Sequence, residues 1–278
     1  MSAIVTRNCN HRMNPMVKKS YELSGYESEM IKPNELIEIK GSGPLTLQDR
    51  RVFNVLLNNA WGKSIVNAGQ EFTISTSELK EVDQTNQRLK RSLRRLMTTV
   101  IVAVKENGDD VETQLLGSRR ITPAGTMTYS FPNELAEVLK DSSVFAKLDL
   151  EVMRSFSSKY AFALYEAIAR RINLKHKFNE SLDIEDMRDL LGVEAGKLLA
   201  YRNLRIKAIE PAVTEVNAIT PYEVTITPLT KGRKVIGFQM YWHVKDEQGL
   251  IASYQELQSA KVGRSKRQTD TAETVVAD

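Results

Sequence analysis

The sequence is poor in the side chains that build disulfides and metal sites. Its one cysteine, Cys9, excludes an intramolecular disulfide and a thiolate metal cluster. The three histidines, His11, His176 and His243, lie far apart in the chain. No group of residue types and spacings suggests a catalytic centre, so we expect no enzyme activity, no cofactor and no bound metal.

Long hydrophobic runs are also missing. No apolar run approaches the roughly 18 residues that a membrane span needs, and the N-terminus lacks an apolar signal core. We therefore expect a cytoplasmic protein with no membrane partner. The net charge of +4, from 39 basic and 35 acidic residues, permits a nucleic-acid partner without requiring one. The placement of the charges is consequently more informative than their sum.

Residues 200–217 (AYRNLRIKAIEPAVTEVN) have the pattern of a helix with a basic side and an apolar side. Before them, Asp183 caps a short helix that Gly192 ends. After them, two alternating segments flank a turn at residues 231–234, which predicts a β-hairpin. This order indicates a winged helix-turn-helix, which places its second helix in a DNA groove. Pro211 removes a backbone donor from that helix and predicts a kink.

The same order of elements occurs in the first half of the chain. A strand at residues 72–74 precedes Ser75 and Glu78, which form a capping box for a brief helix. Residues 87–100 follow as a helix with leucines on one side and arginines on the other. A hairpin is then predicted at residues 100–116. We therefore expect an α+β fold of two tandem winged-helix domains, mainly helical with small antiparallel wings.

The domain limits follow from these patterns. Residues 1–30 lack a regular period and are expected to be an arm that is disordered or ordered only by a partner. Residues 31–146 form the first winged-helix domain, expected to dimerise and to contact the DNA backbone or groove. Residues 147–246 form the second, expected to be the main sequence-specific reader, and the two domains join near residues 141–147. Residues 247–278 are expected to be a largely disordered tail.

Several short motifs occur in order along residues 31–246. In the second half they are SKYA at 158–161, LYE at 164–166, LLGV at 190–193, EPA at 210–212 and KGRKV at 231–235. In the first half they are NELI at 34–37 and the helix at 45–57. In this combination the chain resembles the iteron-binding plasmid replication initiators of the RepA/RepE type.

The resemblance implies two winged-helix domains that bind direct repeats at a plasmid origin as a monomer. It also implies that the protein helps to open the duplex and recruits the host replication initiator and helicase machinery. As dimers, such proteins often bind an inverted repeat at an operator and repress their own gene. The chain departs from the family at Arg205-Ile206-Lys207, where a basic run is usual, so we expect a DNA contact to be absent at Ile206.

We expect the exposed cations and amides of both units to contact DNA. Arginine and asparagine donate paired hydrogen bonds to base edges, and wing cations contact phosphates. Arg205 lies close to the apolar stripe, so it either contacts DNA or extends along the core edge. The wing and the arginine side are, alternatively, only solvated surface. The predicted DNA-binding residues are Arg88, Arg91, Arg94, Arg95, Arg202, Asn203, Arg205, Lys207, Lys231, Arg233 and Lys234.

Two other functions compete with origin initiation. A rolling-circle initiator needs a nucleophilic tyrosine and a metal held by paired histidines, and no His-apolar-His sequence occurs. A transcriptional repressor would bind an inverted repeat as a dimer, with no role in origin opening. A dimerisation surface at Phe53, Leu56 and Leu57 would serve the repressor at all times and the initiator only in its inactive state. Self-association in a monomer–dimer equilibrium is therefore expected.

Overall fold

The computed structural model describes residues 29–267 except residues 64, 66, 68, 81–84, 106, 143, 175 and 265. Nearly all of the predicted arm lies outside the described residues.

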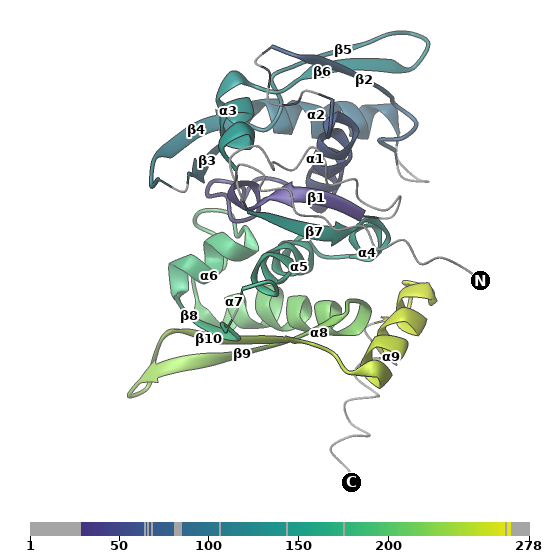
Figure 1. The fold of residues 1–278 in the computed structure, drawn as a ribbon. Helices are drawn as coiled ribbons and strands as arrows, with labels where there is room; N and C mark the ends of the chain where they lie inside the picture. Colours follow the sequence, from purple (N-terminus) through teal and green to yellow (C-terminus); the bar gives the residue numbers. More distant parts are fainter. Residues whose placement is uncertain are drawn as a thin grey trace, which may run out of the picture.

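Figure 1 shows the first half of the chain above the second half. The first half contains β1 (Glu29–Pro33), the 3-10 helix η2 (Asn34–Leu36), α1 (Leu47–Ala60), β2 (Glu71–Ser75), α2 (Asn86–Thr98), β3 (Val100–Val104), β4 (Asp110–Gln114), β5 (Ser118–Ile121), β6 (Thr126–Ser130) and α3 (Asn133–Asp141). The second half contains β7 (Phe145–Asp149), α4 (Leu150–Ser155), α5 (Lys159–Arg171), β8 (Asn179–Asp183), α6 (Ile184–Leu191), α7 (Tyr201–Leu204), the π-helix η3 (Arg205–Ile209), α8 (Glu210–Ile219), β9 (Tyr222–Lys231), β10 (Lys234–Val244) and α9 (Glu247–Gln258).

Two three-stranded antiparallel sheets have the same strand order. In the first half the order is β2-β6-β5, and in the second half it is β8-β10-β9. In each sheet the strand that precedes the basic helix pairs with the second strand of a later hairpin. The chain thus folds as two winged-helix units, as predicted.

The wing of the first unit is not the hairpin that the sequence predicts. Residues 100–116 do contain a hairpin, β3 and β4, but these strands form a separate two-stranded sheet. The strands equivalent to β9 and β10 are β5 and β6, because β6 pairs with β2. The β3–β4 hairpin is therefore an insertion between helix α2 and its wing.

Capping side chains set the ends of several helices, including the helix that the sequence predicts between Asp183 and Gly192. Thr46 Oγ accepts from the Asp49 amide at 3.3 Å, and the Asp49 carboxylate accepts from the Thr46 amide at 2.8 Å. This reciprocal capping box begins α1. Asp183 begins α6 by accepting from the Asp186 amide at 2.8 Å, and Gly192 ends it in the left-handed conformation, with φ of 64°.

The predicted helix after Ser75 does not form. Residues 76–79 make a turn instead. The Ser75 amide donates to the Glu78 carboxylate at 3.2 Å, but Ser75 Oγ accepts from the Ser77 amide at 3.3 Å. So short a segment makes too few backbone hydrogen bonds to offset the cost of nucleating a helix.

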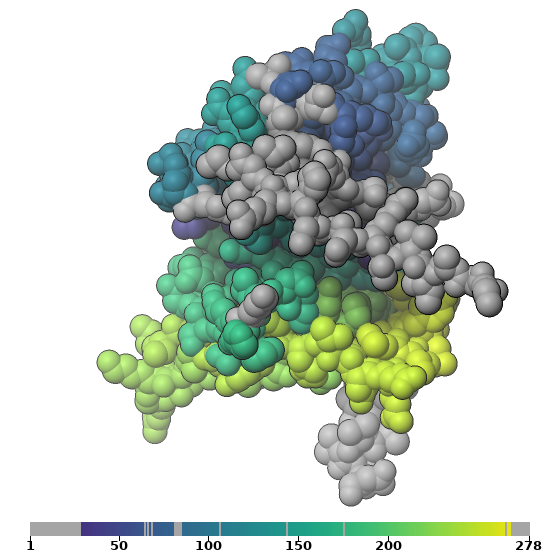
Figure 2. Space-filling model, viewed as in Figure 1, coloured from purple at the N-terminus to yellow at the C-terminus, as the bar shows by residue number. Residues whose placement is uncertain are grey.

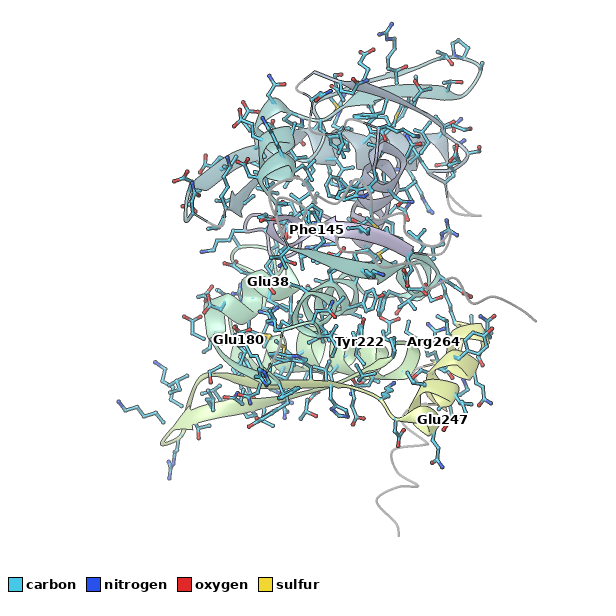
Figure 3. All side chains as sticks on the ribbon, viewed as in Figure 1. Glu38, Phe145, Glu180, Tyr222, Glu247 and Arg264 are labelled. Atoms are coloured by element: carbon cyan, nitrogen blue, oxygen red, sulfur yellow. The ribbon has the colours of Figure 1, made fainter. Side chains whose placement is uncertain are left out.

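The two units are joined by ordered structure. The predicted joint at residues 141–147 includes the start of β7, which pairs with β1 so that Glu29 lies opposite Asp149. β1 and β7 lie between the two units (Figure 1). Glu38, labelled below Phe145 in Figure 3, accepts from Arg170 at 2.6 Å and also from Arg171. The joint is therefore a packed interface and not a free linker.

The described part of the predicted tail is also ordered. Asp246 caps α9 by accepting from the Gly249 amide at 2.8 Å, and α9 packs against α8. Beyond α9, Arg264 is buried and donates to the carbonyl of Ser155 at 2.9 Å and to the Glu256 carboxylate at 3.1 Å. The expectation of a largely disordered tail is wrong for this segment, while residues 268–278 lie outside the described residues.

The side chains assigned to dimerisation lie in the hydrophobic core. Phe53, Leu56 and Leu57 are 2%, 0% and 0% exposed, and the Phe53 ring packs edge-on against Phe131 at 6.3 Å. The apolar side of α1 therefore faces the interior of its own chain. These three side chains form no surface for a partner in this structure, which corrects their assignment.

Candidate nucleic-acid interface

The basic helix of the second unit, formed by α7, η3 and α8, has one buried side and one polar side. Leu204 and Ala208 are 1% and 0% exposed and face the core. Arg202, Asn203 and Lys207 are exposed on the opposite side. Two aromatic rings hold the start of the helix, since Tyr201 stacks on Phe238 with centroids 6.1 Å apart. The helix thus presents three predicted DNA-binding side chains to solvent together.

The predicted distortion near Pro211 takes the form of a π-helical turn, η3. The Glu210 amide donates to the carbonyl of Arg205, which is five residues earlier. Pro211 has no N–H and so cannot bond to the carbonyl of Lys207 as an α-helix requires. Such turns often occur at functional sites. Ile206, in this turn, is 43% exposed, so an apolar side chain lies among the cations.

Arg205 lies at the surface and does not follow the core edge. Its side chain is 47% exposed, and Nε is 3.5 Å from Oε1 of Glu210. An exposed pair of this kind contributes little to stability. The guanidinium can therefore exchange the carboxylate for a phosphate or a base edge at little cost.

The wing of the second unit is the predicted hairpin. β9 and β10 meet at a tight turn in which Gly232 has φ of 61°, a conformation that suits glycine. Lys231, Arg233 and Lys234 are all exposed around this turn. Figure 2 shows the lime-coloured tip of the hairpin projecting from the body of the molecule. The wing therefore presents its cations to solvent beside the basic helix.

Helix α2 carries the arginine side of the first unit. Thr85 caps it by accepting from the Arg88 amide at 3.3 Å, while Leu89 is buried. Arg88, Arg91 and Arg94 are exposed. These three guanidinium groups are available to a polyanion, in agreement with the pattern of the helix.

Arg95 has a structural role that the sequence did not indicate. Its Nε and Nη2 donate to the two oxygens of Asp49 at 2.6 and 2.8 Å, and Asp49 is 0% exposed. These hydrogen bonds raise the pKa of Arg95. The pair holds α2 against α1, so the guanidinium of Arg95 is already bound within its own chain.

Replacing Arg95 with glutamine is expected to lower the free energy of unfolding by about 1.5–3 kcal/mol, since the buried Asp49 loses its charged donors. Arg94→Gln is the control, because Arg94 is exposed and its loss should change stability by less than about 0.5 kcal/mol. Urea unfolding measures both values. Equal stability of the two variants would show that Arg95 does not hold the helices together.

The structure places further basic residues beside α2, and the sequence patterns did not indicate them. A hollow of about 540 Å³ lies between the start of α2, strand β5 and the turn that joins β5 to β6, and Lys80, Lys90 and Arg119 line it. Arg119 belongs to β5, the wing strand that sequence patterns did not identify. The adjacent pair Arg119 and Arg120 was the available signal.

Metal sites and membrane-spanning helices can also be looked for among the described residues. Among them, no three or more His, Cys, Asp or Glu side chains are grouped so that they could hold a metal ion. No helix in the same part of the chain is both long and apolar enough to cross a membrane. The groups that the helices and wings present are mainly cations and amides, which suit a polyanionic ligand.

Two family models match the chain. The one described as "Initiator Replication protein, WH1" matches residues 29–169, and the one described as "Initiator Rep protein, WH2" matches residues 183–242. No curated protein is similar enough in sequence to match. Among solved structures, the crystal structure of Pi initiator protein in complex with iteron DNA is similar at 16% sequence identity, with a TM-score of 0.58. The match covers 81% of this chain and 100% of that one, and it supports the fold.

Proposed function

The chain belongs to the family of initiator replication proteins, and we propose that it is a plasmid replication initiator that binds direct repeats of double-stranded DNA through both winged helices. The repeated strand order is the observation that supports this most. The orders β2-β6-β5 and β8-β10-β9 each place a helix with exposed cations beside a wing. The similar Pi initiator protein is in complex with iteron DNA, which supports the same class of ligand for this chain.

The two units would contribute differently to the recognition of DNA. In the second unit, Arg202 and Asn203 carry the groups that form paired hydrogen bonds with guanine and adenine in the major groove. The wing cations would contact phosphates, which position the helix without reading sequence. In the first unit, Arg88, Arg91 and Arg94 would contact the backbone or a second groove. Sequence preference would then come mainly from the second unit.

The arrangement predicts the length of the binding site. Two winged helices on successive major grooves lie one helical turn apart, which is about 10–10.5 base pairs. The direct repeat would accordingly be about 20 base pairs long. The finer parts of the proposal are that a monomer binds the repeats, helps to open the duplex and recruits host replication proteins in the bacterial cytoplasm. A dimer would repress the gene by binding an inverted repeat.

Footprinting on the DNA that flanks the gene tests the proposal. We expect the wild-type protein to protect two successive major grooves of a direct repeat. Asn203→Ala should weaken binding to this repeat by about 5- to 150-fold, corresponding to the 1–3 kcal/mol of one paired base contact, and should leave nonspecific binding unchanged.

Lys234→Gln is the matched control on the wing. It should weaken binding to all sequences alike, because it removes a phosphate contact. Protection of a single half-site would contradict the use of both winged helices. Binding confined to an inverted repeat, by a protein that stays dimeric on direct repeats, would favour a transcriptional repressor.

A further inference from the structure

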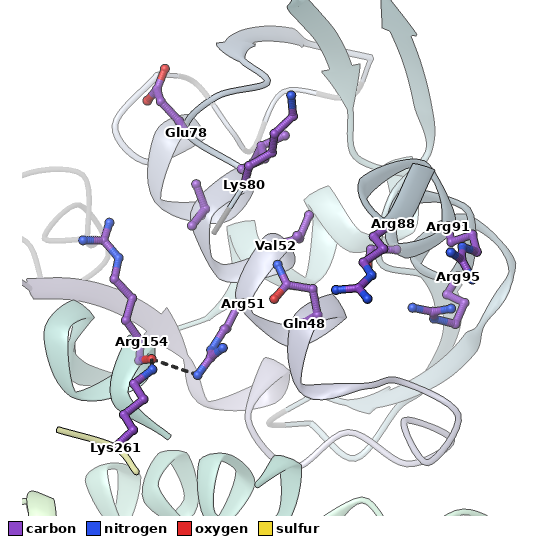
Figure 4. A pocket seen from close by; sticks show the side chains of 13 residues that line it. Gln48, Arg51, Val52, Glu78, Lys80, Arg88, Arg91, Arg95, Arg154 and Lys261 are labelled. Atoms are coloured by element: carbon purple, nitrogen blue, oxygen red, sulfur yellow. Dashed lines mark hydrogen bonds between the residues drawn. The ribbon is translucent and has the colours of Figure 1, made fainter. Parts of the chain in front are cut away.

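A basic groove of about 700 Å³ lies between α1, α2, the end of α4 and the segment that follows α9 (Figure 4). Among the described residues that line it, Glu78 is the only acidic one. The cations along its walls include Arg51, Arg88, Arg91, Arg95, Arg154 and Lys261. The groove therefore combines charges from distant parts of the chain.

The C-terminal end of α4 lines the groove through Arg154, and two other parts of the chain hold this end of the helix. Arg51 of α1 donates to the carbonyls of Met153 at 3.3 Å and Arg154 at 2.9 Å, and also to that of Phe156. Lys261, beyond α9, donates to the carbonyl of Arg154 at 2.6 Å. Figure 4 shows Arg51 and Lys261 converging on this carbonyl. These contacts fix the first unit and the C-terminal segment to one short helix.

The second unit holds the next residues. The buried carboxylate of Glu215, on α8, accepts from the amides of Ser157 and Ser158 at 2.7 and 3.2 Å. The groove therefore lies at the place where the two winged-helix units and the C-terminal segment meet. A ligand bound in it would contact all three parts at once.

Three of the cations that line the groove, all of them arginines, have no partner among the described residues. Arg88, Arg91 and Arg154 are exposed, and their guanidinium groups make no hydrogen bond or ion pair in that part of the chain. Like charges held together repel each other, and an anion between them removes the repulsion. The groove is therefore suited to a ligand with several separated negative charges.

We propose that this groove binds phosphates of the DNA backbone between the two winged helices, a proposal that rests on the proposed function. Arg88 and Arg91 belong to the helix of the first unit, so the groove continues its DNA-facing surface toward the second unit. No aromatic side chain is among the described residues that line the groove, so it has no ring on which a nucleotide base could stack. The ligand is thus a run of backbone phosphates, and Arg154 contacts it together with α2.

Arg154→Gln in the full chain tests the proposal, with gel shifts on the direct repeat over a range of salt concentrations. Loss of one phosphate contact should reduce the slope of log K against log salt by about 0.9 and weaken binding about fivefold near 0.15 M salt. The preference between repeat sequences should not change. Ethylation of phosphates between the two protected grooves should interfere with wild-type binding and no longer with binding of the variant.

Lys266→Gln is the matched control, since it removes a charge from the same C-terminal segment but does not line the groove. It should keep the wild-type slope. Arg154→Lys provides a second variant, and it should keep nearly the wild-type slope because it retains the positive charge. Thermal unfolding of each variant verifies that the fold is retained.

The results that would overturn this inference differ from the results that would overturn the proposed function. A wild-type slope and ethylation pattern for Arg154→Gln, with the repeat still protected, would overturn the groove proposal alone. Absence of wild-type binding to direct repeats would overturn both. Loss of ATP or pyrophosphate binding in Arg154→Gln, with repeat binding intact, would make the groove a site for small phosphate compounds and would also overturn the inference.

Discussion

Replacing Glu166 with glutamine is expected to lower the free energy of unfolding by about 3–5 kcal/mol, because the ammonium of Lys32 is then buried without an opposite charge. Nζ of Lys32 lies 2.7 Å from Oε1 of Glu166, and the side chains are 5% and 0% exposed. Asn54 donates to the same oxygen at 2.9 Å. The pair joins β1 to α5, so its loss should loosen the packing between the units. Urea unfolding followed by circular dichroism measures the change.

The pH dependence of the same variant gives a second readout. Burial lowers the pKa of Lys32 below its usual 10.5. The unfolded chain then holds more protons than the folded one between the lowered pKa and 10.5, so stability rises with pH across this interval. Without the carboxylate of Glu166 the pKa of Lys32 should fall further. The destabilisation of the variant should therefore shrink as the pH is raised from about 7 to about 10.

Two further variants control this experiment. Glu112→Gln removes a carboxylate that is exposed on β4, and it should change stability by less than about 0.5 kcal/mol. Lys32→Met combined with Glu166→Leu removes both charges and should recover most of the loss. A stability of Glu166→Gln equal to that of the wild type would contradict the buried pair.

Replacing Leu56 with alanine is expected to cost about 2–5 kcal/mol of unfolding free energy, because it leaves a cavity in a packed core. Leu56 is 0% exposed, and its carbonyl accepts a hydrogen bond from the hydroxyl of Tyr129 at 2.7 Å. Urea unfolding at several protein concentrations measures the loss. The loss should not depend on concentration, because the side chain packs within its own chain.

Leu250→Ala is the matched control for this substitution. Leu250 is 38% exposed on α9, so its loss should change stability by less than about 1 kcal/mol. Sedimentation of the Leu56 variant separates the two roles of the residue. A variant with wild-type stability and a shifted monomer–dimer equilibrium would restore Leu56 to the dimer contact.

Much of the local structure could be predicted from residue patterns. The start of α1 and both ends of α6 lie at capping residues, and the exposed side of α2 follows from the spacing of its arginines. The turn at residues 231–234 is set by a glycine between alternating strands. Each of these signals involves residues close in sequence. These features can be predicted without the rest of the fold because the backbone hydrogen bonds that form them are local.

The candidate site was predicted in part. The exposure of Arg202, Asn203 and Lys207 follows from helical periodicity. The same periodicity could not show that Arg95 is engaged by Asp49, 46 positions earlier in the chain. It also could not distinguish an apolar side that faces the core, as at Leu56, from one that faces a partner. The spacing of apolar residues shows that one side of a helix is apolar. It does not show whether that side packs against the same chain or against a partner.

The sequence by itself determined that the chain has two basic helices, each followed by a hairpin, and this order was enough to indicate paired winged helices. Only the tertiary structure decided that β6 pairs with β2, that β1 pairs with β7, and that α9 folds back toward α4. The basic groove likewise combines Arg51, Arg88 and Lys261 from distant parts of the chain. Such pairings depend on the summed burial and hydrogen bonding of whole elements, so no short stretch of residues specifies them.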